Sequence, residues 1–238
     1  MILSERPLRM LCLMLFLLSV PFTGACKQKE QAQRKAFIEF LEIHVLAAAG
    51  MDRVRMSDEM RKKVGGYGRH FDVITKYSVE LRDINARLVG EKTRIAAHSP
   101  IPMDKLSSER ARIEQLIAAL SRSAQHVDAV KVKADDAKAV LKQPEDLREV
   151  FDRAYEKEVS EYAAASQALY AVQQDFYAEA LRMGAFLEKH RDKIQFKQKT
   201  VTIEEQSLLH EYNAMQKSLQ EKSQKMQAAL KSGRPLTR

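Results

Sequence analysis

Apolar residues recur every three or four positions along most of the chain, which is the spacing of amphipathic helices. Two long helices are predicted in succession, from about Tyr67 to Ala97 and from about Lys105 to Leu141. Between them lies Ser99-Pro100-Ile101-Pro102, where each proline disfavours helix in the residue before it. Their apolar seams predict an antiparallel helical hairpin. The seam residues are Ile74, Tyr77, Leu81, Ile84, Leu88 and Ile95 in the first helix, and Ile113, Leu116, Leu120, Ser123, Val127, Val130, Ala134, Ala137 and Leu141 in the second.

Further helices are predicted on both sides of this hairpin. Residues 31–49 form one helix, and a short helix follows in which Ser57 is the N-cap and Gly65-Gly66 the stop. After Pro144 a third long helix is predicted from Glu145 to about His190, with an interruption near 160–165, where the seam weakens to small residues. Its seam residues are Leu147, Phe151, Tyr155, Val159, Tyr162, Leu169, Phe176, Met183 and Leu187.

The period changes from helical to alternating over residues 194–203. Ile194–Lys197 and Thr200–Ile203 alternate apolar with polar residues, which predicts a small β-hairpin. A last helix is expected over 204–230, before Gly233 and Pro235. The sequence therefore predicts a mainly α protein: an elongated bundle of long antiparallel helices with a β-hairpin near 194–203. Residues 26–231 form a single domain in this interpretation, and 232–238 form a basic tail.

The N-terminus has the pattern of a bacterial lipoprotein signal peptide. Arg6 and Arg9 precede an uncharged run over 10–20, and small residues precede Cys26. That run is about 16 Å long as a helix, which is too short for a bilayer core of about 30 Å. We expect cleavage after residue 25 and transfer of diacylglycerol to the Cys26 sulfur. The alternatives are cleavage by the general signal peptidase and retention of 1–25 as an N-terminal helix.

Lipidation of Cys26 would decide the cysteine chemistry and the location of the protein. Cys12 leaves with the signal peptide, so the mature chain would contain neither a free thiol nor a disulfide. No cofactor is expected beyond the covalent diacylglycerol and fatty acid on Cys26. Lys27 stands where aspartate commonly signals retention in the inner membrane, and this favours the periplasmic face of the outer membrane.

Basic residues concentrate in the C-terminal part of the chain. The whole chain has a net charge of +8, and residues 217–238 contain six basic residues and one acidic residue. Lys193, Lys197 and Lys199 lie on or beside the predicted hairpin, while Arg34 and Lys35 lie close to the lipid anchor. These five cations are candidate contacts for anionic lipid or lipopolysaccharide. The alternative is a solvated helix surface of mixed charge, and nucleic acid is not an expected partner of a secreted lipoprotein.

Composition and spacing do not indicate catalysis. Two cysteines cannot form a four-thiolate zinc or iron–sulfur site. None of the six histidines has an acidic residue three positions away, the Gly65–Gly68 run lacks the lysine of a phosphate-binding loop, and no Gly-x-Ser-x-Gly motif is present. We therefore expect no metal site and no enzymatic activity.

Three segments of the chain resemble a known family. They are Gln33–Leu41 (QRKAFIEFL), Leu141–Ala154 (LKQPEDLREVFDRA) and Glu211-Tyr212-Asn213. In this order they are similar to the YiaF-type bacterial lipoproteins, a family of unknown function. The resemblance implies an envelope lipoprotein and transfers no catalytic residue.

These observations together predict a lipid-anchored, periplasm-facing structural or interaction module of the cell envelope. Its expected partners are the membrane, through the anchor, and anionic lipid, lipopolysaccharide or envelope proteins. The alternative is an enzyme or carrier that acts on cell-wall or lipid substrates in a groove between the long helices.

Overall fold

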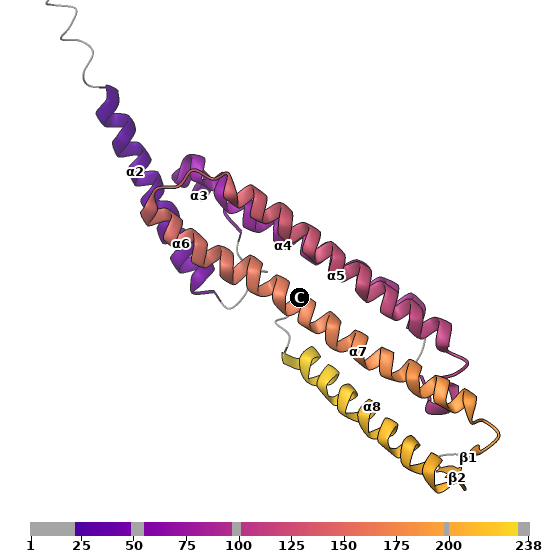
Figure 1. The fold of residues 1–238 in the computed structure, drawn as a ribbon. Coiled ribbons are helices and arrows are strands. Elements are labelled where there is room, and N and C mark those ends of the chain that lie inside the picture. The colour runs from indigo at the N-terminus through magenta and orange to yellow at the C-terminus, as the bar shows by residue number, and fades with distance from the viewer. Residues whose placement is uncertain (1–21, 49–54, 97–100, 198–199, 233–238) are drawn as a thin grey trace, which may run out of the picture.

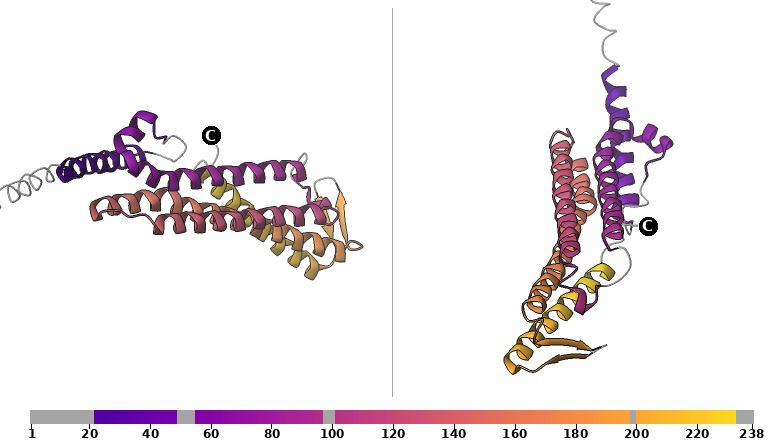
Figure 2. Two further views of the ribbon diagram at one scale, coloured as in Figure 1. Left: turned by 90° about the horizontal axis from the view of Figure 1, so that it is seen from above. Right: turned by 90° about the vertical axis from the view of Figure 1, so that its right-hand side faces the viewer.

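A computed structural model describes residues 22–48, 55–96, 101–197 and 200–232 (Figure 1). The predicted class is confirmed: the described chain is mainly α, with one two-stranded antiparallel sheet. The long helices lie side by side in an elongated bundle, with an N-terminal helix at one end and the β-hairpin at the other (Figures 1 and 2).

The predicted hairpin of long helices is formed by α4 (Gly68–Ala96) and α5 (Arg110–Ala139). The seams are those expected from the sequence: Ile74, Leu81 and Leu88 are buried in α4, as are Ile113, Leu120 and Val127 in α5. The second helix begins later than the predicted Lys105, because a 3-10 turn, η4 (Met103–Lys105), and further turns precede Arg110. Pro102 is the extended residue before this turn.

The third long helix is continuous but contains a π-helical turn. It consists of α6 (Glu145–Tyr155), the π turn η5 (Glu156–Ser160) and α7 (Glu161–Lys189). The interruption predicted near 160–165 is therefore wrong in position, and the irregularity occurs one turn earlier. At the start of α6, Glu145 and Asp146 lie where the helix dipole favours negative charge.

The predicted seam of the third helix is confirmed at most positions and differs at two. The buried members are Leu147, Phe151, Tyr155, Val159, Tyr162, Met183 and Leu187. A regular α-helix extended from Leu147 would bury positions 169, 172 and 176. After the π turn, which inserts one residue, Leu169 and Phe176 are instead only half-buried and Tyr170 and Gln173 are buried, so the buried positions are shifted in this part of α7. A polar glutamine is consequently buried where apolar periodicity predicted none.

The first described helix is longer than predicted. Helix α2 (Phe22–Phe40) starts before the expected Gln31 and continues into a π turn, η1 (Leu41–Leu46). Helix α3 (Asp58–Val64) has the predicted cap, because Ser57 Oγ accepts from Met60 N at 3.1 Å. It ends at Gly65, whose φ of +56° is costly for any residue with a Cβ, and a 3-10 turn, η3 (Gly65–Tyr67), leads into α4.

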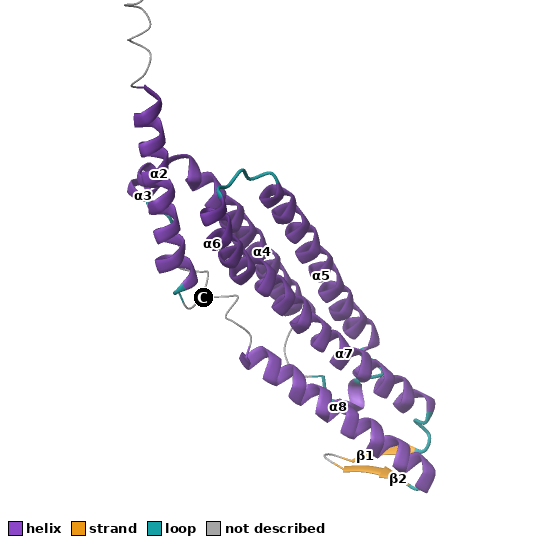
Figure 3. Ribbon diagram, turned by 60° about the vertical axis from the view of Figure 1, so that its left-hand side comes forward, coloured by secondary structure: helices purple, strands orange, loops and turns teal. Residues whose placement is uncertain are grey.

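The β-hairpin and the last helix close the distal end of the molecule. Strands β1 (Ile194–Lys197) and β2 (Thr200–Ile203) form the predicted hairpin, and they pair with Ile194 opposite Ile203. Both isoleucines are buried, which is how so small a sheet gains stability. Helix α8 (Gln206–Ser232) then runs back along α7 (Figure 3).

Buried apolar residues form two clusters along the bundle. The first joins α2, η1, α3, α4, α6 and parts of α5 and α7; the second joins the start of α5, the end of α7, the β-hairpin and α8, and Tyr177 packs against both. All buried members of the two clusters lie between Ala36 and Tyr212, so residues 27–238 contain the complete described core. None of the described helices is long and apolar enough to cross a membrane.

Candidate functional site

Cys26 lies on a polar arm at one end of the molecule. Each residue from Cys26 to Ala32 is exposed, whereas Ala36, Phe37 and Phe40 later in the same helix are buried. The first half of α2 therefore extends away from the bundle and the second half packs on it (Figure 1). The predicted signal peptide, 1–25, lies outside the described residues except for 22–25, which belong to α2.

The two candidate cations of α2, Arg34 and Lys35, differ in their surroundings. Arg34 is mostly buried and makes ion pairs, with Nε 3.3 Å from Asp146 Oδ2 and Nη1 3.9 Å from Glu30 Oε1. Tyr67 also donates to Glu30 Oε1. Lys35, in contrast, is exposed. Arg34 thus links the arm to α6, and Lys35 is the better placed of the two to reach a membrane surface.

Two sets of contacts fix the second half of α2 and the following turn η1 on the bundle, and so hold the exposed arm in place. Phe37 is fully buried, with its ring centroid 6.1 Å from that of Tyr67 and 6.4 Å from that of Phe40. Lys157 Nζ donates to the carbonyl oxygens of Val45, Leu46 and Ala48 at 2.6–2.9 Å. These oxygens are at the end of a helix, where carbonyls lack intrahelical partners, so one lysine satisfies all three.

His70 lies within this aromatic contact. Its ring meets those of Phe37, Tyr67 and Phe151 edge to face, with centroids 5.3–6.3 Å apart. Gln143 Nε2 donates to His70 Nδ1 across 3.0 Å, which requires this nitrogen to be unprotonated. Burial, and secondarily the positive charge of Arg69, lowers the pKa of His70 below its ordinary value. The folded protein therefore favours the neutral imidazole.

Acidification should consequently destabilise the fold through His70. The unfolded imidazole takes up its proton near pH 6.5, while the folded one binds it only at lower pH, so this part of the stability is present above about pH 6.5 and is lost as pH falls below it. We expect the urea-derived free energy of unfolding to fall more between pH 7.5 and 5.5 in the wild type than in His70→Gln. The other histidines are common to both proteins, and equal losses would contradict the assignment.

The candidate cations of the β-hairpin are partly neutralised. Lys193 Nζ donates to Glu205 Oε2 at 2.9 Å, and this hydrogen bond raises the pKa of Lys193. Lys197 is exposed at the end of β1, and Lys199 lies outside the described residues. In the following helix, Lys222 pairs with Asp175 at 2.6 Å and with Glu179 at 3.5 Å. Part of the C-terminal charge excess thus holds α8 on α7.

A buried polar layer connects α4 to α7. Tyr170 Oη donates to Asn85 Oδ1 at 2.5 Å, and Lys92 Nζ donates to Gln173 Oε1. Burial lowers the pKa of Lys92. Sequence reasoning missed this layer, because an isolated polar residue in a helix gives no signal of burial. These two hydrogen bonds each join α4 to α7, so we interpret the layer as a device that aligns the two helices.

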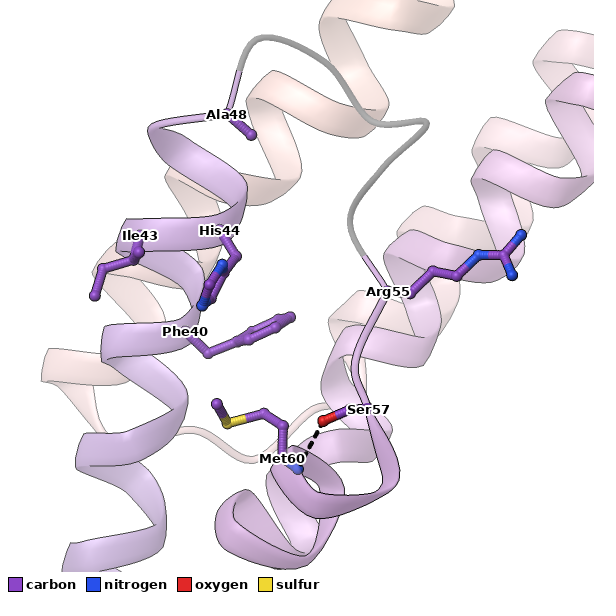
Figure 4. Close-up of a pocket in the computed structure, with 7 residues that line it drawn as sticks. All are labelled: Phe40, Ile43, His44, Ala48, Arg55, Ser57 and Met60. Carbon is purple, nitrogen blue, oxygen red and sulfur yellow. Dashed lines mark hydrogen bonds between the residues drawn. The ribbon is translucent and has the colours of Figure 1, made fainter. Parts of the chain in front are cut away.

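A cavity of about 370 Å³ lies between η1 and the segment around Ser57 (Figure 4). Phe40 and Met60 point toward one another across it, whereas Arg55 points away. His44 lies against Phe40, with ring centroids 5.4 Å apart, and the Ser57 hydroxyl caps α3. Few polar groups are therefore directed into this cavity.

A second groove, of about 360 Å³, lies between α5, α7, α8 and the segment 101–106. Its walls are apolar or aromatic except for Arg112, Ser223 and Gln227. Arg112 is 25% exposed and its Nη1 lies 3.2 Å from Glu109 Oε2. The remaining lining residues are Ile101, Met103, Leu106, Ile113, Leu116, Phe176, Tyr177, Ala180, Leu219 and Met226.

Metal binding finds no support among the residues that the structure describes. No group of three or more His, Cys, Asp and Glu side chains in this part of the chain could hold an ion. His70 contacts aromatic rings and Gln143, while nearby Asp72 pairs with Arg61 at 2.7 Å.

The chain is similar to uncharacterised bacterial proteins. It is 27% identical over 202 residues to the uncharacterized protein YiaF of Escherichia coli K12, which covers 84% of each chain, and the same values hold for YiaF of Shigella flexneri. No solved structure matches. Residues 11–233 match the family model described as "Protein of unknown function (DUF3053)". Because this match spans nearly the whole sequence, the chain belongs to the DUF3053 family.

Proposed function

We propose that this protein is a lipid-anchored module of the bacterial cell envelope, attached through Cys26 and facing the periplasm. The observation that carries the proposal is the position of Cys26, exposed on a polar arm beyond the packed bundle. A lipid on this sulfur would enter a bilayer without disturbing either core. The basic n-region and the apolar run before Cys26 supply the expected export signal.

The surroundings of Cys26 suit a membrane surface. Lys27, Lys29 and Lys35 are exposed on the same arm. Lysines near an anionic surface each contribute about 1 kcal/mol to binding, which supplements a lipid anchor. Beyond the arm, ion pairs such as Lys133–Glu80 and Arg110–Glu114 cross or follow a surface of mixed charge. Such a surface is consistent with a structural or interaction role.

Replacing Cys26 with serine should abolish lipid labelling. In cells given an alkyne fatty acid, the wild-type protein should carry a label that survives a denaturing gel, and Cys26→Ser should carry none, because serine lacks the sulfur that accepts diacylglycerol. Cys12→Ser is the matched control and should keep the label, since Cys12 leaves with the signal peptide. Persistent labelling of Cys26→Ser, or its loss in Cys12→Ser alone, would refute the proposed anchor.

A further inference from the structure

We propose that the groove between α5, α7 and α8 binds one long-chain fatty acid, with the acyl chain along its apolar walls and the carboxylate at Arg112. This inference goes beyond the proposed anchor and does not depend on it. The groove is lined by residues of α5, α7, α8 and the segment 101–106, whereas Cys26 lies in α2, which contributes no lining residue. The lipid attached to Cys26 is thus not the proposed occupant.

The apolar face of α8 is the first observation. Leu208 and Tyr212 are buried near its start, but the same face is only half-buried at Leu219 and Met226, which line the groove. One turn later Leu230 is 52% exposed. The apolar surface therefore runs as a narrow track from the groove toward the end of α8, and an extended acyl chain matches such a track.

The charge of the groove is the second observation. Among the described residues that line the groove, Arg112 is the only charged one and none carries a carboxylate. Burial raises the pKa of Tyr177, another lining residue, and the positive charge of Arg112 opposes this rise. A partly buried guanidinium beside apolar walls complements a ligand with one anionic head, and its planar fork fits a carboxylate with two parallel hydrogen bonds.

Glu109 is one group that competes with a ligand for the charge of Arg112. Its Oε2 lies 3.2 Å from Arg112 Nη1, so a bound carboxylate would share the guanidinium with it. One arginine shared in this way suits a single carboxylate better than a phosphate head group with greater charge. The volume, about 360 Å³, is within the range of small-molecule pockets. These features favour a fatty acid over a phospholipid or a protein partner.

The test uses residues 27–238, which contain the complete described core, and a fluorescent fatty acid, dansyl-undecanoic acid. We expect saturable binding that palmitate displaces more strongly than hexadecanol, its neutral counterpart, or lysophosphatidylglycerol. Arg112→Gln should weaken palmitate binding about tenfold or more, because hydrogen bonds between charged groups are lost. Glu109→Gln should strengthen it, because the competing carboxylate is removed. The opposite signs distinguish a binding role from a loss of folding.

Two further variants complete the test. Arg110→Gln is the matched control: Arg110 is exposed, pairs with Glu114 and lies outside the groove, so its affinity for palmitate should be unchanged. Ser223→Trp should block the probe by filling the groove. The inference is overturned if palmitate does not displace the probe, if Arg112→Gln binds palmitate as the wild type does, or if lysophosphatidylglycerol competes better. The inference would also be overturned if the wild type sediments as a dimer and Ser223→Trp as a monomer, because the groove would then be an interface between two copies of the chain.

Discussion

Replacing Phe37 with alanine is expected to lower the free energy of unfolding by about 3–5 kcal/mol, the usual cost of removing a buried phenylalanine. Phe37 is fully buried and its ring meets those of Phe40, Tyr67 and His70. The substitution would leave a cavity where the second half of α2 contacts α4, so α2 should pack less firmly on the bundle. Urea unfolding measures the loss, and limited proteolysis should cleave α2 first.

Ile43→Ala is the matched control for this prediction. Ile43 lies a few residues away on the same continuous helical segment and is 63% exposed, so its truncation should change stability by less than about 0.5 kcal/mol. A loss at Phe37 no larger than that at Ile43 would show that the aromatic cluster does not hold α2. The result bears on function, because this cluster fixes the arm that carries Cys26.

Gly184→Ala should destabilise the protein by about 1–3 kcal/mol, the range for overpacking a filled core. Gly184 is in α7, where a Cβ would lie 2.9 Å from the Leu106 carbonyl oxygen and 3.0 Å from its carbonyl carbon. Both are backbone atoms, so no side-chain rotation relieves the contact. The segment 101–106 must move away from α7, which would also widen the fatty-acid groove.

The same substitution at Gly90 should have the opposite sign. Gly90 is in the interior of α4, and a Cβ there would meet no atom of the described residues within 4 Å. Gly90→Ala should therefore raise stability by about 0.5–1 kcal/mol, because alanine favours helix over glycine. Thermal or urea unfolding of the two variants side by side tests the pair. Stabilisation by both alanines would mean that α7 does not approach Leu106 as closely as the structure shows.

The α4–α5 hairpin shows why periodicity predicted so much of this fold. In a regular α-helix the positions three and four apart share one face, so a run such as Ile113, Leu116 and Leu120 identifies the buried face without knowledge of its partner. The β-hairpin was predicted for a similar reason, since alternation places Ile194 and Ile203 on one face. Local rules suffice where the backbone remains regular.

The third long helix shows where these rules fail. Apolar periodicity selected Leu169 and Phe176, but in this part of α7, after the π turn at 156–160, Tyr170 and Gln173 are buried instead. A π turn depends on how the whole helix packs against its neighbours, and the residue types at 156–160 do not indicate one. The hydrogen bond between Gln173 and Lys92 joins this part of the helix to α4.

The candidate sites divide in the same way. Cys26, the basic residues and the absence of known catalytic motifs can be read from the chain, because an export signal and a motif are local patterns. Whether a given cation is paired cannot be read from it: Arg34 meets Asp146, Lys222 meets Asp175, and Lys35 is exposed. These pairs join residues that are far apart in sequence, and only the folded chain brings them together.

The sequence by itself determined the helical class, the two long seams, the β-hairpin and the position of the cysteine, since each depends on neighbours within a few residues. The tertiary structure alone decided the groove at Arg112, the packing of α2 on the bundle and the three carbonyl oxygens that accept from Lys157. The groove joins three separate helices, and Lys157 lies more than a hundred residues from the carbonyls to which it donates. Their geometry depends on how whole helices pack, which short-range spacing does not encode.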